Sequence, residues 1–283
     1  MTKPTSIPAP NLESDVSLAV AGDRQALERV VEAIQSDVYR LAVRFLWHPQ
    51  DAEDACQEIL IRVVTNLGTY RGESAFRTWV FRVASNTLLT MRAKRAESLA
   101  VSLEEFGKDL ATGLSDEWPD AARKVEHELL LEEVRIGCTM AMLLCLDRPL
   151  RIAYILGEIL GLDHNEGSSA LQIRPAAFRA RVSRARRAIQ ATMTSHCGLI
   201  NPDNACRCRK RVKPAIELGR VDPDRLLFAT SLAQARAFPA VLRTMRSLEQ
   251  GRRAAALYRA QVDRTPAEFT QWIRTWLETN WKS

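Results

Sequence analysis

The sequence predicts an all-α protein. Apolar residues recur every three or four positions along most of the 283-residue chain, which is the period of helices that bury one face. Glycine and proline cluster at a few points between these stretches, where helices end and begin. Residues 162–187, LDHNEGSSALQIRPAAFRARVSRARR, are typical of two short helices joined by a tight turn.

This helix-turn-helix stretch carries start signals for both helices. Asp163 is an N-cap type of residue for a first helix that ends near Leu171. Pro175 follows the turn 172–174 and suits the first position of a helix, where a backbone N–H has no partner. Spacings of four, three and four place one set of apolar residues on a single face of the second helix: Phe178, Val182, Ala185 and Ile189.

Arginine occupies the rest of the second helix, at positions 179, 181, 184, 186 and 187. A basic helix that follows a short helix and a turn can enter the major groove of DNA and reach phosphates and guanine edges. The alternative interpretation is an ordinary amphipathic helix with a solvated basic face.

Composition favours a globular protein, and its uneven charge fits both a polyanionic partner and a basic one. Apolar residues make up 46% and charged residues 26% of the chain, and no apolar run approaches the ~20 residues of a membrane span. The N-terminus lacks the apolar core of a signal peptide, so we expect a cytoplasmic protein with no membrane partner and with reduced cysteines. Residues 196–283 hold 16 Lys and Arg against 8 Asp and Glu, whereas the rest holds 24 against 26.

The first third of the chain predicts three helical stretches. Apolar positions recur from 15 to 47, with a turn at Gly22-Asp23 and an end at His48-Pro49. A helix over 51–67 carries an acidic stripe, Asp51, Asp54 and Glu58, which also suits a helix dipole. A further helix follows the break at 68–72. Its aromatic and basic residues are interleaved, as on protein surfaces that stack unpaired bases. The alternative is that the aromatic rings are buried in the protein core.

Two motifs in this order resemble a known family. DAEDACQEILIRV (51–63) with YRGESAFRTWVFRVASN (70–86) is similar to the second conserved region of bacterial sigma factors of the extracytoplasmic-function group. Residues 162–187 resemble the fourth-region helix-turn-helix of the same group. The resemblance covers about two-thirds of the chain and implies a sigma factor that directs RNA polymerase to promoters.

The resemblance also implies partners and site residues. Core RNA polymerase, through its β′ and β subunits, would contact Asp51, Asp54, Gln57 and Glu58. The −10 element of the promoter would be melted and bound by Arg71, Arg77, Trp79, Arg82 and Asn86, with a base flipped into a pocket. The −35 element would be read by Arg174, Arg179, Arg181, Ser183, Arg184, Arg186 and Arg187. The resemblance leaves open whether an anti-sigma factor binds this chain.

Some positions depart from the family pattern. Gly167 replaces an apolar residue of the first helix, which we expect to cost packing and about 1 kcal/mol of helix propensity. Gln172 replaces the turn glycine, and Ala176-Ala177 replace polar residues that often meet DNA. These departures bear on the strength of −35 recognition.

The predicted organisation has five parts. A disordered lead (1–14) precedes a region 2-like domain (15–96), an acidic linker (97–124), a region 4-like domain (125–193) and a helical C-terminal extension (194–283). The acidic linker would mimic RNA in the polymerase channels, as the resemblance implies. In the extension we expect helices from about Arg225 to Phe238 and from Pro239 onward, and a last one with an aromatic stripe.

The extension opens with a cluster of potential metal ligands: His196, Cys197, Cys206 and Cys208. Four such side chains can hold a tetrahedral zinc, although the spacing differs from paired CxxC motifs and no cofactor is required by the resemblance. A redox-responsive cluster is the alternative, because neighbouring arginines would lower the pKa of the thiols. The third interpretation is that these thiols bind no ligand. Cys138 and Cys145, on an apolar helix face, are expected in a hydrophobic core.

Three functions are therefore open. The first is a non-enzymatic transcription initiation factor, since no phosphate loop, metalloprotease motif or catalytic triad is present. The second is a metal- or thiol-sensing transcription switch. The third is a helix-turn-helix regulator that never joins polymerase.

Overall fold

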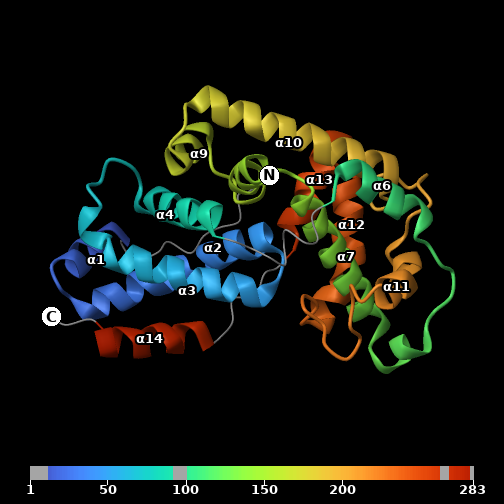
Figure 1. Ribbon diagram of the computed structural model, residues 1–283, viewed down its shortest axis with the longest axis horizontal. Coiled ribbons are helices and arrows are strands. Elements are labelled where there is room, and N and C mark those ends of the chain that lie inside the picture. Colours follow the sequence, from blue (N-terminus) through green and yellow to red (C-terminus); the bar gives the residue numbers. More distant parts are fainter. Residues whose placement is uncertain (1–11, 92–100, 262–267, 281–283) are drawn as a thin grey trace.

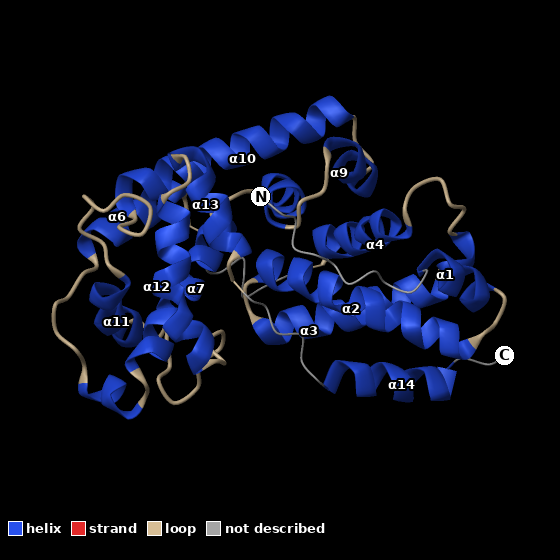
Figure 2. Ribbon diagram, turned by 180° about the vertical axis from the view of Figure 1, so that it is seen from behind, coloured by secondary structure: helices blue, strands red, loops and turns tan. Residues whose placement is uncertain are grey.

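Every regular element in the described residues is a helix, as Figure 2 shows. The computed structural model describes residues 12–91, 101–261 and 268–280, and extended backbone pairs there only in an isolated bridge between Cys197 and Cys206. The all-α prediction is confirmed. The elements in order (Figure 1) are α1 (Leu12–Val20), α2 (Arg24–Leu46), α3 (Pro49–Thr65), η1 (Leu67–Thr69), α4 (Phe76–Thr90), α6 (Leu103–Thr112), η2 (Asp120–Lys124), α7 (His127–Leu144), α8 (Arg148–Tyr154), the π-helical turn η3 (Ile155–Ile159), α9 (His164–Leu171), α10 (Pro175–His196), α11 (Cys208–Glu217), α12 (Leu232–Arg246), α13 (Gln250–Arg259) and α14 (Glu268–Asn280).

Local capping explains where α2 and α3 begin. The Asp23 carboxylate accepts the N–H of Ala26 at 3.0 Å and begins α2. The Nδ1 atom of His48 accepts the N–H of Gln50 at 3.2 Å and begins α3, with Pro49 in the first turn. Side-chain acceptors at these positions satisfy N–H groups that a helix start leaves free, so the predicted breaks are confirmed.

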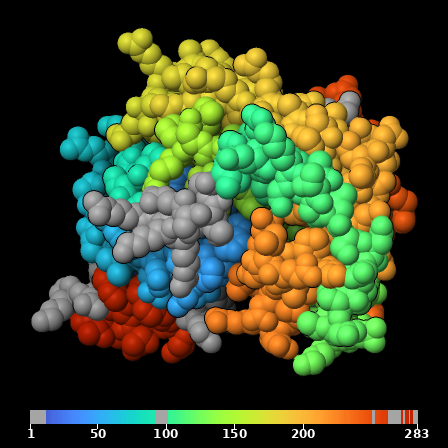
Figure 3. All heavy atoms as spheres, turned by 45° about the vertical axis from the view of Figure 1, so that its right-hand side comes forward, coloured from blue at the N-terminus to red at the C-terminus, as the bar shows by residue number. Residues whose placement is uncertain are grey.

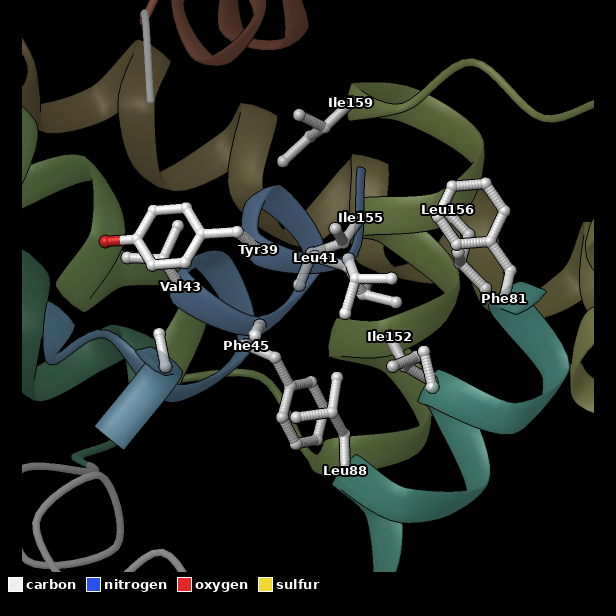
Figure 4. Close-up of a cluster of buried hydrophobic side chains, with 14 of the residues drawn as sticks. Tyr39, Leu41, Val43, Phe45, Phe81, Leu88, Ile152, Ile155, Leu156 and Ile159 are labelled. Carbon is white, nitrogen blue, oxygen red and sulfur yellow. The ribbon is translucent and has the colours of Figure 1, made fainter. Parts of the chain in front are cut away.

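Two parts of the chain share one hydrophobic core: the helices α1–α4, called the first half below, and the helices α7–α10, called the helix-turn-helix half. Figure 4 shows side chains of α2 and α4 facing those of α8 and η3. The sequence predicted two units joined by a linker, and whether each folds alone stays a prediction. In the structure they bury one continuous set of apolar faces, which includes Leu41, Phe45, Phe81, Leu88, Ile152, Ile155, Leu156 and Ile159.

Two arginines of α8 join the halves through helix ends. The Arg151 guanidinium donates to the carbonyl oxygens of Phe45 (3.0 Å) and Leu144 (2.9 Å), at the ends of α2 and α7. The Arg148 guanidinium donates to the carbonyl oxygen of Met91 (2.8 Å), just after α4. Both guanidinium groups lie over the Phe45 ring. Charged donors thus satisfy carbonyl groups that a helix end leaves unpaired.

The predicted linker contains a helix, α6, that packs on α10. Ser102 and Glu105 form a reciprocal capping box at its start, and Phe106 and Leu110 are buried. This helix was not predicted, although a serine three residues before a glutamate at the start of an apolar stretch signals a helix start.

The first part of the C-terminal extension differs from the prediction. No helix begins near Arg225, because the buried Glu133 carboxylate on α7 accepts the N–H groups of Leu227, Phe228 and Ala229 at 2.8–2.9 Å. Burial raises the pKa of Glu133, and these three hydrogen bonds oppose that shift. The helix α12 begins after the Ser231 cap and continues through the expected break at 239, while α11 was not foreseen.

The last two helices of the extension, α13 and α14, contact α2 and α7. The Tyr258 hydroxyl of α13 donates to the carbonyl oxygen of Thr139 at 2.8 Å, and the Tyr258 carbonyl accepts from the buried Arg44 of α2 at 3.3 Å. On α14, Arg274 forms an ion pair with Glu32 of α2 at 2.9 Å. None of the described helices combines the length and apolar character needed to cross a membrane.

Candidate nucleic-acid interfaces

The helix-turn-helix forms as the sequence predicted. Asp163 accepts the N–H groups of Asn165 (2.7 Å) and Glu166 (2.9 Å), and the Glu166 carboxylate accepts the N–H of Asp163. Gln172 ends α9 with φ 51°, the left-handed conformation that a glycine adopts more readily. Pro175 begins α10. The turn therefore keeps its geometry without the family's glycine.

The Phe178 ring fixes the angle between α9 and α10. Phe178, Val182, Ala185 and Ile189 are buried, as predicted. A Cβ atom at Gly167 would lie 2.1 Å from Cζ of Phe178, a distance at which the ring would have to move. The expectation that Gly167 costs packing is therefore wrong, because the glycine provides the space that the ring fills.

The opposite face of α10 is basic and open to solvent. Exposed side chains are those of Arg174, Arg179, Ser183, Arg184, Arg186 and Arg187, and Arg181 is half-buried. Arg186 forms an ion pair with Glu158 of η3, whereas the other α10 arginines have no acidic partner among the described residues. Most of the positive charge on this face is thus available to an anion.

A cavity of about 320 Å³ opens between η1 and the start of α4. The Tyr70 hydroxyl on its wall donates to the carbonyl oxygen of Ser74 at 2.8 Å and lies 3.1 Å from a Glu13 carboxylate oxygen. Burial and Glu13 raise the pKa of Tyr70, so the hydroxyl stays protonated. The lining residues are Thr69, Tyr70, Arg71, Glu73, Ser74, Trp79 and Arg82.

Three residues predicted to contact the −10 element have protein partners. Trp79 is 6% exposed and stacks on Phe76 with ring centroids 5.7 Å apart, so it supports the cavity more than it presents a face for stacking. The Arg77 guanidinium pairs with the Asp37 carboxylate at 2.6 and 2.9 Å. Exposed Asn86 donates to the Gln172 side chain. Their contacts with DNA stay predictions.

The acidic stripe of α3 lies on the face away from α2. Asp54 is exposed, whereas Asp51, Gln57 and Glu58 are partly exposed. Glu58 pairs with Arg62 one helical turn later on the same helix. The other face of α3 is buried in the core, so the four predicted polymerase contacts can meet a partner without unfolding the helix.

The C-terminal cysteines do not form the predicted metal site. No group of three or more His, Cys, Asp or Glu side chains in the described ranges is placed to hold a metal ion. The His196 ring packs on Gly107 of α6, where a Cβ atom would lie 2.7 Å from Nε2. Metal binding therefore stays a prediction that this arrangement does not favour.

The thiols are also unlike those of a redox sensor. Burial raises the pKa of Cys206 to about 11 and that of Cys208 to about 12, and it raises the pKa of Cys197 as well. Burial and the thiols of Cys197, Cys208 and Cys206 raise the pKa of Cys138. Neighbouring arginines do lower these pKa values, as expected, but the loss of hydration has the larger effect and the net shift is upward.

Alkylation kinetics test these thiols. At pH 8 a thiol of pKa about 11 is ~0.1% thiolate, against about a quarter for an ordinary thiol of pKa 8.5. We expect iodoacetamide to modify the cysteines of the folded protein at least ~100-fold more slowly than those of the protein in guanidinium chloride. Equal rates in the two states would reinstate the redox-sensor interpretation.

Known proteins resemble about three-fifths of the chain. Residues 30–97 match the family model Sigma-70 region 2. The RNA polymerase sigma-H factor of Pseudomonas aeruginosa is 33% identical over 178 residues, which cover 61% of this chain and 88% of that protein. The ECF RNA polymerase sigma-E factor of Haemophilus influenzae is 30% identical over 175 residues (60% and 88%).

A further relative and a solved structure also match the chain. The ECF RNA polymerase sigma-E factor of Escherichia coli is 31% identical over 171 residues, which cover 59% of this chain and 86% of that protein. Among solved structures, CnrH in complex with the cytosolic domain of CnrY matches with a TM-score of 0.44 and 21% identity, over 64% of this chain and 96% of that chain. The curated relatives thus leave about two-fifths of this chain unmatched.

Proposed function

Because this chain belongs to the extracytoplasmic-function group of RNA polymerase sigma factors, we propose that α3 binds core polymerase while α4 and α10 bind the −10 and −35 elements of a promoter. The protein acts in the cytoplasm and has no catalytic activity of its own. An anti-sigma partner stays a prediction from the resemblance. The exposed arginine face of α10, mostly without carboxylate partners, carries the proposal.

The two interfaces suit different tasks. The α10 face presents several guanidinium groups along one side of a rigid helix, which fits phosphates and base edges of a duplex. The cavity beside α4 is concave, is flanked by Arg71 and Arg82, and has a volume that suits a single flipped base. Duplex recognition by α10 and capture of an unpaired base beside α4 together describe promoter binding and melting.

Run-off transcription tests this function. Core polymerase is mixed with the purified chain and a library of genomic fragments, and transcripts that depend on the chain are sequenced. A shared upstream motif among those fragments supports the proposal. A chain that core polymerase does not retain, or that yields no transcript from any fragment, contradicts it.

Removing two arginines from α10 tests the −35 assignment. With Arg179→Ala and Arg184→Ala together, we expect holoenzyme binding to a selected promoter to weaken about 10- to 1000-fold. For each lost phosphate contact, the slope of log affinity against log salt should fall by about 0.9. The measurement is a filter or fluorescence titration at several salt concentrations.

Arg252→Ala is the matched control for that variant. Arg252 is also an exposed arginine, lies on α13 away from the α10 face, and forms an ion pair with Glu249. It should leave both affinity and salt slope unchanged. An α10 variant that behaves like Arg252→Ala would remove α10 from the promoter contacts.

A further inference from the structure

The helix α4 packs on α9 of the helix-turn-helix, which places the two proposed promoter-binding surfaces too close together for their task. The Asn86 side chain at the end of α4 lies 3.4 Å from the Gln172 side chain at the end of α9. Promoter elements centred at −10 and −35 are about 25 base pairs apart, or about 85 Å along B-form DNA. The 22-residue α10 spans only about 33 Å. The halves must therefore separate before both elements can be bound.

The connection between the halves limits how far they can separate. After α4 ends at Thr90, the chain reaches α6 at Leu103, and α6 packs on α10. These 13 residue steps span at most about 45 Å when fully extended, so the helices themselves must supply the rest of the 85 Å. Release of α6 and the residues after it from their present positions would lengthen this connection and ease separation to 85 Å.

The C-terminal extension holds that segment through Arg211. The guanidinium of this buried residue donates to the carbonyl oxygens of Asp109 (2.7 Å) and Gly113 (2.5 Å), at the end of α6. The Asp109 carboxylate accepts from Arg211 (2.5 Å) and Arg220 (2.8 Å). Burial alone would raise the pKa of Asp109, but the two guanidinium groups hold it below its usual value.

A second row of contacts continues along the linker. Lys210 pairs with the Asp116 carboxylate at 3.0 Å, and Lys213 pairs with Glu117. The N–H of Ser115 donates to the Lys210 carbonyl at 2.9 Å. Figure 3 shows the linker, in green, lying along the extension, in orange. The acidic residues of the linker thus meet a basic surface of their own chain.

We propose that the C-terminal extension is an intramolecular latch. Its basic surface, formed by Arg209, Lys210, Arg211, Lys213 and Arg220, holds the linker on α11 and keeps α4 packed on α9 of the helix-turn-helix. Release of the linker carboxylates frees the connection that the halves need to span a promoter. The latch rests on the proposed function, because the 85 Å requirement comes from promoter binding.

Locking the latch is the first arm of the test. In Lys213→Cys with Glu117→Cys, a short bis-thiosulfonate reagent joins α11 to the linker through disulfides that reductant cleaves. Lys213 also pairs with Glu217 on the same helix, so Lys213→Cys with Glu217→Cys is the matched control. We expect the first cross-link to lower run-off transcription at least ~10-fold and reductant to restore it, with no change in the control.

Releasing the latch is the second arm. Lys210→Glu with Lys213→Glu should raise transcription roughly three- to tenfold, because exposed ion pairs contribute modestly and two are reversed here. Adding Asp116→Lys and Glu117→Lys re-forms both pairs with opposite polarity and should return transcription to the wild-type level. Hydrogen exchange of residues 109–117 in the free protein should rise and fall in parallel.

The outcomes separate the latch from the function. A cross-linked protein that transcribes as well as its control overturns the latch and leaves the proposed function standing. Charge reversal that neither raises transcription nor speeds exchange also overturns it. A wild-type chain that gives no transcript with core polymerase overturns the proposed function and the latch with it.

Discussion

With Asp54 and Glu58 both changed to Arg, capture of the chain by core RNA polymerase should fall at least ~100-fold. Both side chains lie on the solvent side of α3, and Asp54 is the most exposed of the four predicted contacts. A reversed charge at an interface places like charges together, which costs about 2–5 kcal/mol for each well-desolvated contact. Pull-down with tagged core enzyme, followed by a quantitative titration, measures the loss.

Glu104→Arg is the matched control. Glu104 pairs with Lys108 one turn later on α6, as Glu58 pairs with Arg62 on α3, and both acids are solvent-exposed. Reversal at either site costs a helix only about 0.5 kcal/mol, so circular dichroism should show folded protein in both cases. Undiminished capture of the α3 variant, or equal loss in the control, would contradict the polymerase-binding assignment.

Gly167→Ala should destabilise the protein by about 2–3 kcal/mol. The added Cβ would meet the buried Phe178 ring at 2.1 Å, and displacing a packed ring costs more than the roughly 1 kcal/mol that alanine gains in helix propensity. A melting temperature lower by about 5–10 °C is the expected calorimetric result. Promoter binding should fall as well, because the Phe178 ring sets the angle between α9 and α10.

A control variant and a compensating double variant test whether the Phe178 ring causes this loss of stability. Gly68→Ala is the control, since a Cβ there has no neighbour within 4 Å and the backbone is not left-handed. It should change stability by less than ~0.5 kcal/mol. Gly167→Ala combined with Phe178→Leu should recover part of the lost stability by vacating the space. A fully stable Gly167→Ala single variant would show that the ring moves at no cost.

Much of the local structure could be predicted because its causes are local. The helix starts at Asp23 and Asp163, the break at His48-Pro49 and the buried stripe of α10 depend on residues within one or two turns of each other. The helix α6 had the same kind of signal in Ser102 and Glu105 and was missed only because acidic residues around it suggested a tether. The exposed arginines of α10 follow from the same periodicity.

The sequence by itself therefore determined α1–α4, the helix-turn-helix and the face on which its arginines lie. Only the tertiary structure decided that Gly167 makes room for a ring, that burial outweighs arginine at the cysteines, and that Glu133 keeps residues 227–229 out of a helix. It also placed the acidic linker on α11. The physical reason is that capping and periodicity act over a few residues, whereas packing, desolvation and charge pairing depend on segments that are distant in the chain and meet only when it folds.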